Sequence, residues 1–228
     1  MSEDTGLSPI SSVHLKDAAY LAIRDAITTL ELEPGRAISE NMLVKRLGVS
    51  KTPIRAALGR LEAEGMVATV PFKGTFVRAV DDRDARGLIE LRRALETAAV
   101  RAVCNYATDD ELAELEEVAC QASMDEAAGE HESALRDLGD FHHRLVLLAG
   151  NAWLEAAYLA ISGPLARIRV LSGDQSSSID ASSSEHADIV KALVRRDDKS
   201  AVGLIEAHLD RVLELFEKAA STKVIETE

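Results

Sequence analysis

The sequence predicts a mainly α-helical protein in which a small N-terminal domain ending in a β-hairpin precedes a larger, all-helical antiparallel bundle. Hydrophobic residues make up 46% of the chain, whereas aromatic residues, which favour strands, make up only 4%. Short runs of strand type lie within residues 67–77, and the pattern from residue 84 onwards is helical. The length of 228 residues suits two domains of modest size.

The sequence shows no membrane or export signal. No segment approaches the roughly twenty apolar residues that span a bilayer, and residues 1–12 lack the apolar stretch of a signal peptide. Cys104 and Cys120 match no zinc or redox spacing and are expected to be reduced core residues. We therefore expect a cytoplasmic protein with no membrane partner.

Charge divides the chain into a basic head and an acidic body. The formal net charge is −13, which by itself argues against an anionic partner. Residues 16–78 nevertheless hold ten Lys/Arg against seven Asp/Glu, a balance of +3, whereas residues 79–228 hold sixteen against thirty, a balance of −14. Binding to phosphate is therefore expected of the head, and the acidic body would repel DNA.

The first elements of the head follow from local signals. An apolar stripe over residues 13–32 predicts a helix that ends before Pro34-Gly35. Ser39 is a good N-cap for a short helix through Leu47, and Gly48 suits its C-terminal end.

A third helix and a hairpin complete the head. Pro53 suits the first turn of a helix that ends at Gly65, because the missing N–H of proline would be unpaired there anyway. Two strand-type runs, 67–70 and 75–77, are joined by a turn at residues 71–74. Two short helices around a glycine turn form a helix-turn-helix, and the hairpin forms a wing. We therefore expect a winged helix-turn-helix domain over residues 1–78.

A polar linker is expected at residues 79–83 and the helical domain at residues 84–228. Within the domain, periodicity predicts a series of helices at 84–105, 109–128, 131–149, 151–172, 183–196 and 199–219. The serine-rich stretch 172–184 reads as a loop, and Ser182 with Glu185 reads as a capping box that opens the next helix.

The start of the third helix carries the candidate DNA contacts. A recognition helix reads the major groove from its N-terminal turn. Ser50 and Thr52 can bind phosphate, and the planar side chain of Arg55 can pair with a guanine. Lys51 and the wing residues Lys73 and Gly74 can reach the backbone or a minor groove. Each charge alone is better explained as a solvated surface group, but the set at these positions favours DNA.

The head resembles the GntR family of bacterial regulators over about residues 18–77. The resemblance rests on Pro34-Gly35, Ile38-Ser39-Glu40, the run Leu47–Leu58 (LGVSKTPIRAAL) and Leu61–Gly65 (LEAEG). It implies a set of DNA-contacting residues, namely Ser50, Lys51, Thr52, Arg55, Lys73 and Gly74. The family commonly has Arg where this chain has Asn41, which can still bind phosphate or a base edge but carries no charge.

Three of the six histidines lie on apolar stripes of three different helices. His142, His186 and His208 should each point into the bundle, and facing helices of bundles build metal sites from such side chains. Neutral imidazole suits zinc and nickel. The alternative is three separate core histidines, each with its own hydrogen bond, and spacing alone leaves both interpretations open.

The body resembles the FCD domain of the FadR-type subfamily over about residues 84–220. The resemblance rests on Phe141-His142, Gly150-Asn151, Glu185-His186, His208-Leu209 and the pair Arg92/Glu96. It implies a homodimer, a divalent metal held by the three histidines, and an effector in the same cavity.

The position of the fourth ligand is a departure from this pattern. The resemblance implies Asp or Asn four residues before the first histidine, where this chain has Leu138, flanked by Asp137 and Asp140. We therefore expect three protein ligands, unless a distorted helix brings one of the two aspartates in.

The expected effector is a small organic acid. Arg92 and Arg169 are candidates to bind its carboxylate, although a surface salt bridge within the acidic domain explains Arg169 equally well. Asn151 is a third candidate, although an asparagine after a glycine can equally cap a helix.

The sequence as a whole predicts a repressor that binds double-stranded operator DNA and is released by this acid. One alternative is a metal-dependent enzyme that acts on a small carboxylate, with Glu185 or Asp140 as general base. The chain lacks a nucleophile motif, a phosphate-binding glycine loop and a dinucleotide fingerprint, so we expect no enzyme. A further alternative is a regulator for which the metal itself is the signal.

Overall fold

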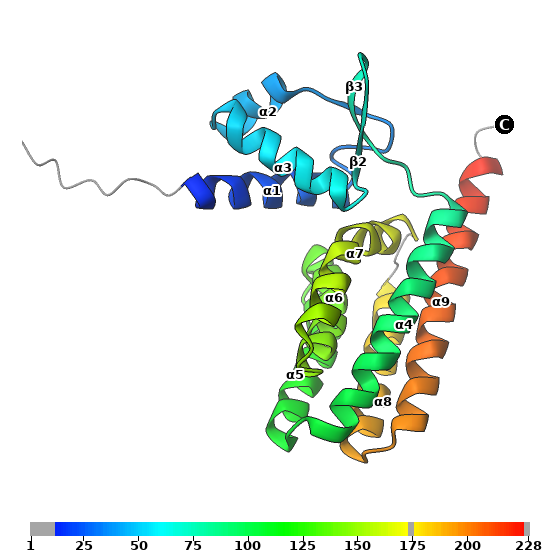
Figure 1. Ribbon diagram of the computed structural model, residues 1–228. Helices are drawn as coiled ribbons and strands as arrows, with labels where there is room; N and C mark the ends of the chain where they lie inside the picture. Colours follow the sequence, from blue (N-terminus) through cyan, green and yellow to red (C-terminus); the bar gives the residue numbers. More distant parts are fainter. Residues whose placement is uncertain (1–11, 173–175, 226–228) are drawn as a thin grey trace, which may run out of the picture. The chain divides into compact units, whose positions relative to one another are not determined.

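The computed structural model describes residues 12–172 and 176–225. These residues form two compact units that divide between Ala79 and Val80, and we call them the winged domain and the helical domain (Figure 1). Within the described ranges, helices dominate and a single small sheet lies in the winged domain, which confirms the predicted fold class. None of the described helices combines the length and the apolar character that a membrane span requires.

The winged domain packs three helices against a three-stranded antiparallel sheet. Its elements are α1 (Ser12–Thr28), β1 (Ala37–Ile38), α2 (Glu40–Leu47), α3 (Lys51–Ala63), β2 (Val67–Val70) and β3 (Gly74–Val77), with strand order β1-β3-β2. Thr69 pairs with Thr75 in the hairpin, as expected for the wing. The first strand was not predicted, because two residues give no periodic signal. Ile23, Ile27 and Ile54 form the centre of the core and are at most 1% exposed.

A tight turn sets the angle between α2 and α3. Gly48 has a φ of +67°, a left-handed conformation that glycine adopts at little cost, and its N–H donates to the carbonyl of Val44 at 3.0 Å. Pro53 lies buried in the first turn of α3. Both signals work locally, so this part of the fold follows directly from the sequence.

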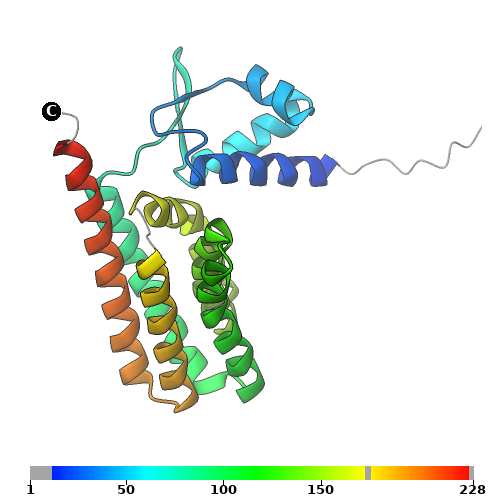
Figure 2. The same cartoon turned by 180° about the vertical axis from the view of Figure 1, so that it is seen from behind.

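The helical domain is a bundle around one core. Its helices are α4 (Asp82–Tyr106), α5 (Asp109–Ala127), α6 (His131–Leu148), α7 (Ala152–Leu171), α8 (Ser176–Val194) and α9 (Asp198–Ile225). The long helices α4 and α9 run side by side, and α5 packs against both α6 and α8 (Figures 1 and 2). The core includes Val100, Phe141, Leu145, Ile189 and Ile205, none of which is exposed to solvent.

Two expected boundaries of the helical domain were wrong. Helix α4 begins at Asp82, inside the expected linker, because the side chain of Asp81 accepts a hydrogen bond from the backbone N–H of Asp84 at 2.7 Å. Helix α8 begins at Ser176, inside the expected loop, so Ser182 and Glu185 lie within a helix and form no capping box.

The structure also adds a capping box that was not predicted and corrects one smaller expectation. A capping box does occur at α5, between Thr108 and Glu111. Cys104 is buried, but Cys120 is exposed and is therefore no core residue.

Candidate metal centre and nucleic-acid interface

The three predicted histidines converge inside the helical domain. His142 of α6, His186 of α8 and His208 of α9 each offer one ring nitrogen, and these atoms all lie within 4.8 Å of one another. The ring centroids are 4.6 to 4.9 Å apart, and each residue is at most 3% exposed. Within residues 12–172 and 176–225, no carboxylate belongs to this group.

His142 is held by a buried carboxylate. Its Nδ1 lies 3.0 Å from Oε2 of Glu96, whose other oxygen accepts a hydrogen bond from Nε of Arg92 at 2.6 Å. The side chains of Arg92 and Glu96 are 4% and 0% exposed, respectively. Because Nδ1 is engaged, Nε2 is the nitrogen of His142 that remains for a metal.

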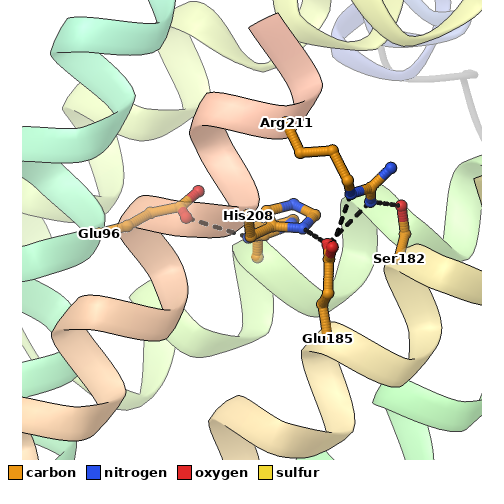
Figure 3. A network of polar contacts seen from close by, with 6 residues as sticks. Glu96, Ser182, Glu185, His208 and Arg211 are labelled. Carbon is orange, nitrogen blue, oxygen red and sulfur yellow. Dashed lines mark hydrogen bonds and ion pairs between the residues drawn. The ribbon is translucent and has the colours of Figure 1, made fainter. Parts of the chain in front are cut away.

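His208 is held in the same manner from another side. Its Nδ1 lies 2.6 Å from Oε2 of Glu185, and Arg211 donates to both oxygens of that carboxylate, from Nε at 2.6 Å and from Nη2 at 2.8 Å. Arg211 also donates to the hydroxyl of Ser182 at 2.6 Å. Figure 3 shows Glu185 next to both His208 and Arg211, with Glu96 on the opposite side of His208.

His186 has no such support. Its ring stacks on Phe141 with the centroids 4.0 Å apart and an interplanar angle of 13°. Both ring nitrogens are buried, and neither has a hydrogen-bond partner among the described residues. An unsatisfied buried polar group costs about 1–3 kcal/mol. The cluster thus resembles a ligand set more than three satisfied core histidines.

Electrostatics favours the neutral form of all three imidazoles. Burial lowers the pKa of His142 and of His186 well below the usual value, and the positive charge of Arg92 acts in the same direction. Burial also lowers the pKa of His208, although the hydrogen bond to Glu185 opposes the shift. A histidine must be neutral to bind a metal, so the cluster is chemically ready to do so.

A small cavity of about 30 Å³ adjoins the histidines. Arg92 and Arg169 line it, together with Leu138, which occupies the position of the fourth ligand expected from the resemblance. Nη2 of Arg92 is buried and has no hydrogen-bond partner among the described residues. Nη1 of Arg169 donates to the carbonyl of Leu135 at 3.0 Å, and Gly139 leaves room for it, since a Cβ there would lie 2.9 Å from Nη1.

The other residues considered for the cavity lie elsewhere. Asn151 is the N-cap of α7. Its side-chain oxygen accepts hydrogen bonds from the backbone N–H groups of Trp153 at 3.1 Å and Leu154 at 3.2 Å. Asp137 hydrogen-bonds Asp125, and burial together with that carboxyl raises its pKa to about 6. Asp140 is exposed. The structure thus brings Arg92 and Arg169 to the histidines, but not Asn151, Asp137 or Asp140.

The DNA candidates are all exposed on the winged domain. Ser50, Lys51, Thr52 and Arg55 lie at the start of α3, Asn41 lies in the first turn of α2, and Lys73 and Gly74 lie at the tip of the wing. Nε of Arg55 donates to both carboxylate oxygens of Glu40, at 2.9 and 3.0 Å. The Arg55 side chain is thus directed toward Glu40 by an ion pair that is exposed to solvent.

Sequence reasoning missed several residues around these sites. Arg211 carries no functional signal of its own. Glu96 belongs to the motif with Arg92 and lies four residues after it, on the same face of α4, but its contact with His142 was not predicted. Phe72 at the wing tip is fully exposed and has a φ of +62°, which is uncommon for a bulky residue. Its place in the turn was predicted, but its exposure was not considered.

Both domains of the chain match known protein families. The model of the bacterial regulatory proteins, gntR family, matches residues 15–77, and the FCD domain model matches residues 87–211. The Nta operon transcriptional regulator of Aminobacter aminovorans is 36% identical over 194 residues, which cover 82% of this chain and 90% of that protein.

Two further relatives span nearly the whole chain. The transcriptional repressor RspR of Escherichia coli is 24% identical over 94% of this chain and 93% of its own length. The solved structure of McbR/YncC from E. coli shares the fold, with a TM-score of 0.76 at 19% identity over 90% of this chain and 97% of that one. The chain therefore belongs to the GntR family of bacterial regulatory proteins, with a C-terminal FCD domain, and it is a transcriptional regulator, not an enzyme.

Proposed function

We propose that this protein is a homodimeric, cytoplasmic repressor that binds operator DNA through its winged domain and is released by a small organic acid. The acid binds beside a divalent metal in the helical domain. The observation that supports this best is the pair of unsatisfied groups at one cavity, the ring nitrogens of His186 and Nη2 of Arg92. The imidazole nitrogens suit coordination of a metal ion, and the guanidinium nitrogen suits an anionic group.

The residues present fit a transition metal. His142, His186 and His208 would hold it, and three nitrogen ligands suit zinc or nickel. When bound, the metal supplies a Lewis acid with open positions for a carboxylate or hydroxyl group. The protein holds the imidazoles neutral and, through Glu96 and Glu185, fixes the orientation of two of them.

The arginines at the cavity favour an anionic effector. Arg92 is buried, with one nitrogen bound to Glu96 and Nη2 left over. Arg169 adds a second positive charge at the same wall, and its charge also lowers the pKa of His142. Guanidinium groups bind carboxylates with two parallel hydrogen bonds, so a small organic acid is the effector class that fits. We assign no effector role to Asn151, because it caps α7.

The DNA interface is assigned to the start of α3 and to the wing. Ser50, Lys51 and Thr52 contact phosphates, and Arg55 reads a base in the major groove. Asn41 supports the contact from α2, and the wing tip with Lys73 and Gly74 contacts the neighbouring backbone or minor groove. All seven of these residues are exposed, as such contacts require.

Release follows from thermodynamic linkage between the two sites. A two-fold dimer places two α3 helices on two half-sites at a fixed spacing. An effector that binds one arrangement of the winged domains better than another shifts the population and thereby the DNA affinity. The E. coli relative is named a transcriptional repressor, which supports repression as the default output.

Fluorescence anisotropy with a labelled duplex from the protein's own upstream region tests this function. The chelator-treated protein is titrated first alone, then with Zn²⁺ or Ni²⁺, and then with the metal and a panel of small carboxylic acids. We expect sequence-specific binding that one acid weakens at least tenfold in the metal-loaded protein. His208→Ala should lose the response, whereas the exposed His131→Ala serves as the matched control. The absence of specific binding under every condition would reject the proposal.

A second candidate, a regulator that senses the metal alone, is favoured by one observation. The cavity of about 30 Å³ holds an ion or a few waters but leaves little room for an organic acid unless the helices move. If Zn²⁺ or Ni²⁺ changes the DNA affinity by itself and no acid adds to the change, this second function replaces the first.

A further inference from the structure

We propose that Glu185 and Arg211 are positioning residues for the metal ligand His208. These three residues form a hydrogen-bonded Arg–Glu–His chain, here called a relay, that affects metal binding alone. The matching relay Arg92–Glu96–His142 affects metal binding and also binds the effector. This inference rests on the proposed metal function. It assigns roles to three residues, Glu96, Glu185 and Arg211, that touch neither the metal nor DNA.

The two relays have the same order and the same chemistry. In each, an arginine Nε donates to one carboxylate oxygen of a glutamate at 2.6 Å, and the other oxygen meets a histidine Nδ1, at 3.0 Å for His142 and at 2.6 Å for His208. The first relay joins α4 to α6, and the second joins α8 to α9. Two independent copies of one arrangement around one cluster indicate a function beyond packing.

The two relays differ in whether the Nη2 group of the arginine already has a hydrogen-bond partner. Arg92 lines the cavity, and its buried Nη2 has no partner within the described parts of the chain. Arg211 does not line the cavity, and its Nη2 is shared by Glu185 and Ser182. An effector carboxylate at Arg92 would therefore compete with Glu96 or add to its hydrogen bonds. Arg211 lies outside the cavity lining, so such a carboxylate would not meet its guanidinium group directly, although Ser182 and His208 do line the cavity.

The physical effect of each relay acts on the histidine. A carboxylate at Nδ1 fixes the tautomer with the proton on Nδ1 and the lone pair on Nε2, fixes the ring orientation and makes the ring a stronger ligand. The arginine keeps the carboxylate in place, and Ser182 keeps Arg211 in place. Loss of such an outer partner typically lowers metal affinity 10- to 100-fold.

Metal titration of the full-length protein tests the relay. Zn²⁺ affinity is measured by competition with a chromogenic chelator, and Co²⁺ absorption reports the ligand field. Glu185→Gln keeps the shape and a hydrogen-bond acceptor but removes the charge, so we expect a 10- to 100-fold loss of affinity and an altered Co²⁺ spectrum. Arg211→Gln should give a smaller loss of the same kind.

The control is an ion-paired arginine whose side chain is exposed to a similar degree but whose carboxylate partner contacts none of the three histidines. Arg93 bonds Asp210 and the carbonyl of Glu206 across α4 and α9, so Arg93→Gln should leave the Zn²⁺ affinity unchanged. A merely structural role of Glu185 would lower the melting temperature of the metal-free protein without changing metal affinity. If Glu185→Gln fails to fold, Arg211→Gln and Arg211→Lys carry the test, because the serine and glutamate partners stay in place.

The outcomes separate this inference from the proposed function. If the wild-type protein binds neither Zn²⁺ nor Co²⁺, the metal function itself fails. If the wild-type protein binds them and both Glu185→Gln and Arg211→Gln bind them equally well, only the relay is overturned. If the effector response survives in Arg211→Gln at saturating metal but is lost in Arg92→Gln, the division between the two relays is supported, and the reverse result contradicts it.

Discussion

The winged domain and the helical domain each contain an arginine–glutamate pair at a proposed binding site, but in opposite settings. In the winged domain, the side chains of Arg55 and Glu40 are 65% and 34% exposed. In the helical domain, those of Arg92 and Glu96 are 4% and 0% exposed. The exposed pair can open toward a large polyanion, whereas the buried pair is a fixed part of a core.

The setting decides what each pair contributes. An exposed ion pair is worth about 0–1 kcal/mol, since water solvates both groups when they part. A buried pair gives little net stability over an apolar pair, but loss of one partner leaves an uncompensated charge in the core. We therefore expect stability to depend on the buried pair and DNA affinity to depend on the exposed one.

The largest effect is expected from Glu96→Gln. It leaves the charge of Arg92 buried and uncompensated, which should lower the free energy of unfolding of the helical domain by about 3–5 kcal/mol. Calorimetry or urea denaturation of the full chain measures the loss. The matched change in the winged domain, Glu40→Gln, should cost less than about 1 kcal/mol. Equal losses at the two positions would contradict the contrast between the settings.

The next effect concerns DNA binding. Arg55→Ala should lower affinity for the best duplex by about 1–3 kcal/mol, roughly 10- to 100-fold, and relax the base preference at one position. Lys51→Ala should weaken binding to all duplexes alike and reduce the slope of affinity against salt by about one. Anisotropy titrations at several salt concentrations distinguish the two, and melting temperatures should stay unchanged. A wild-type base preference in Arg55→Ala would show that this side chain reads no base.

A smaller, pH-dependent effect is expected at Asp137. Its pKa is raised to about 6 by burial and by Asp125 and Asp140, while Arg136 opposes the shift. Between about pH 4 and 6 the folded state therefore keeps a proton that the unfolded state has released, so the contribution of Asp137 to stability falls as pH rises through this range. Unlike Glu96, this carboxyl is hydrogen-bonded to another carboxyl group rather than to an arginine.

The variant Asp137→Asn measures that contribution. It should stabilise the helical domain at pH 7.5 by about 1 kcal/mol, a value reduced for solvent screening at this half-buried site, and should have no effect near pH 4. Thermal melts across this pH range provide the measurement. A difference from wild type that does not change with pH would show that Asp137 does not titrate in this range.

The two domains also differ in how far the sequence predicts them. The turn at Gly48, the proline at the start of α3 and the hairpin of the wing are local signals, and the structure has all three. The start of α8 was not predicted, because the intrinsic propensities of its serine-rich sequence favour a loop. Ser182 and Ser183 are both 5% exposed, so packing overrides propensity there.

The candidate sites show the same division. The apolar stripes predict that His142, His186 and His208 face inward, and the structure has them adjacent. The glutamates behind them were not predicted, because the contacts between Glu96 and His142 and between Glu185 and His208 depend on the rotation of one helix against another. Helical periodicity predicts which face is buried, but it does not predict which side chain of the next helix that face meets.

The smallest effect is expected at Phe72, in the turn of the wing. A bulky residue with a φ of +62° is strained, and this side chain is fully exposed, so it gains no packing in return. Asn tolerates the left-handed conformation, and Phe72→Asn should therefore stabilise the winged domain by about 0.5 kcal/mol, with no change in the unfolding of the helical domain. Calorimetry of the two transitions measures this, and anisotropy with the operator duplex runs in parallel. A stabilised wing that binds DNA less well would show that the winged domain gives up some stability for DNA binding. A destabilised wing would show instead that the left-handed conformation of Phe72 carries no strain that Asn relieves.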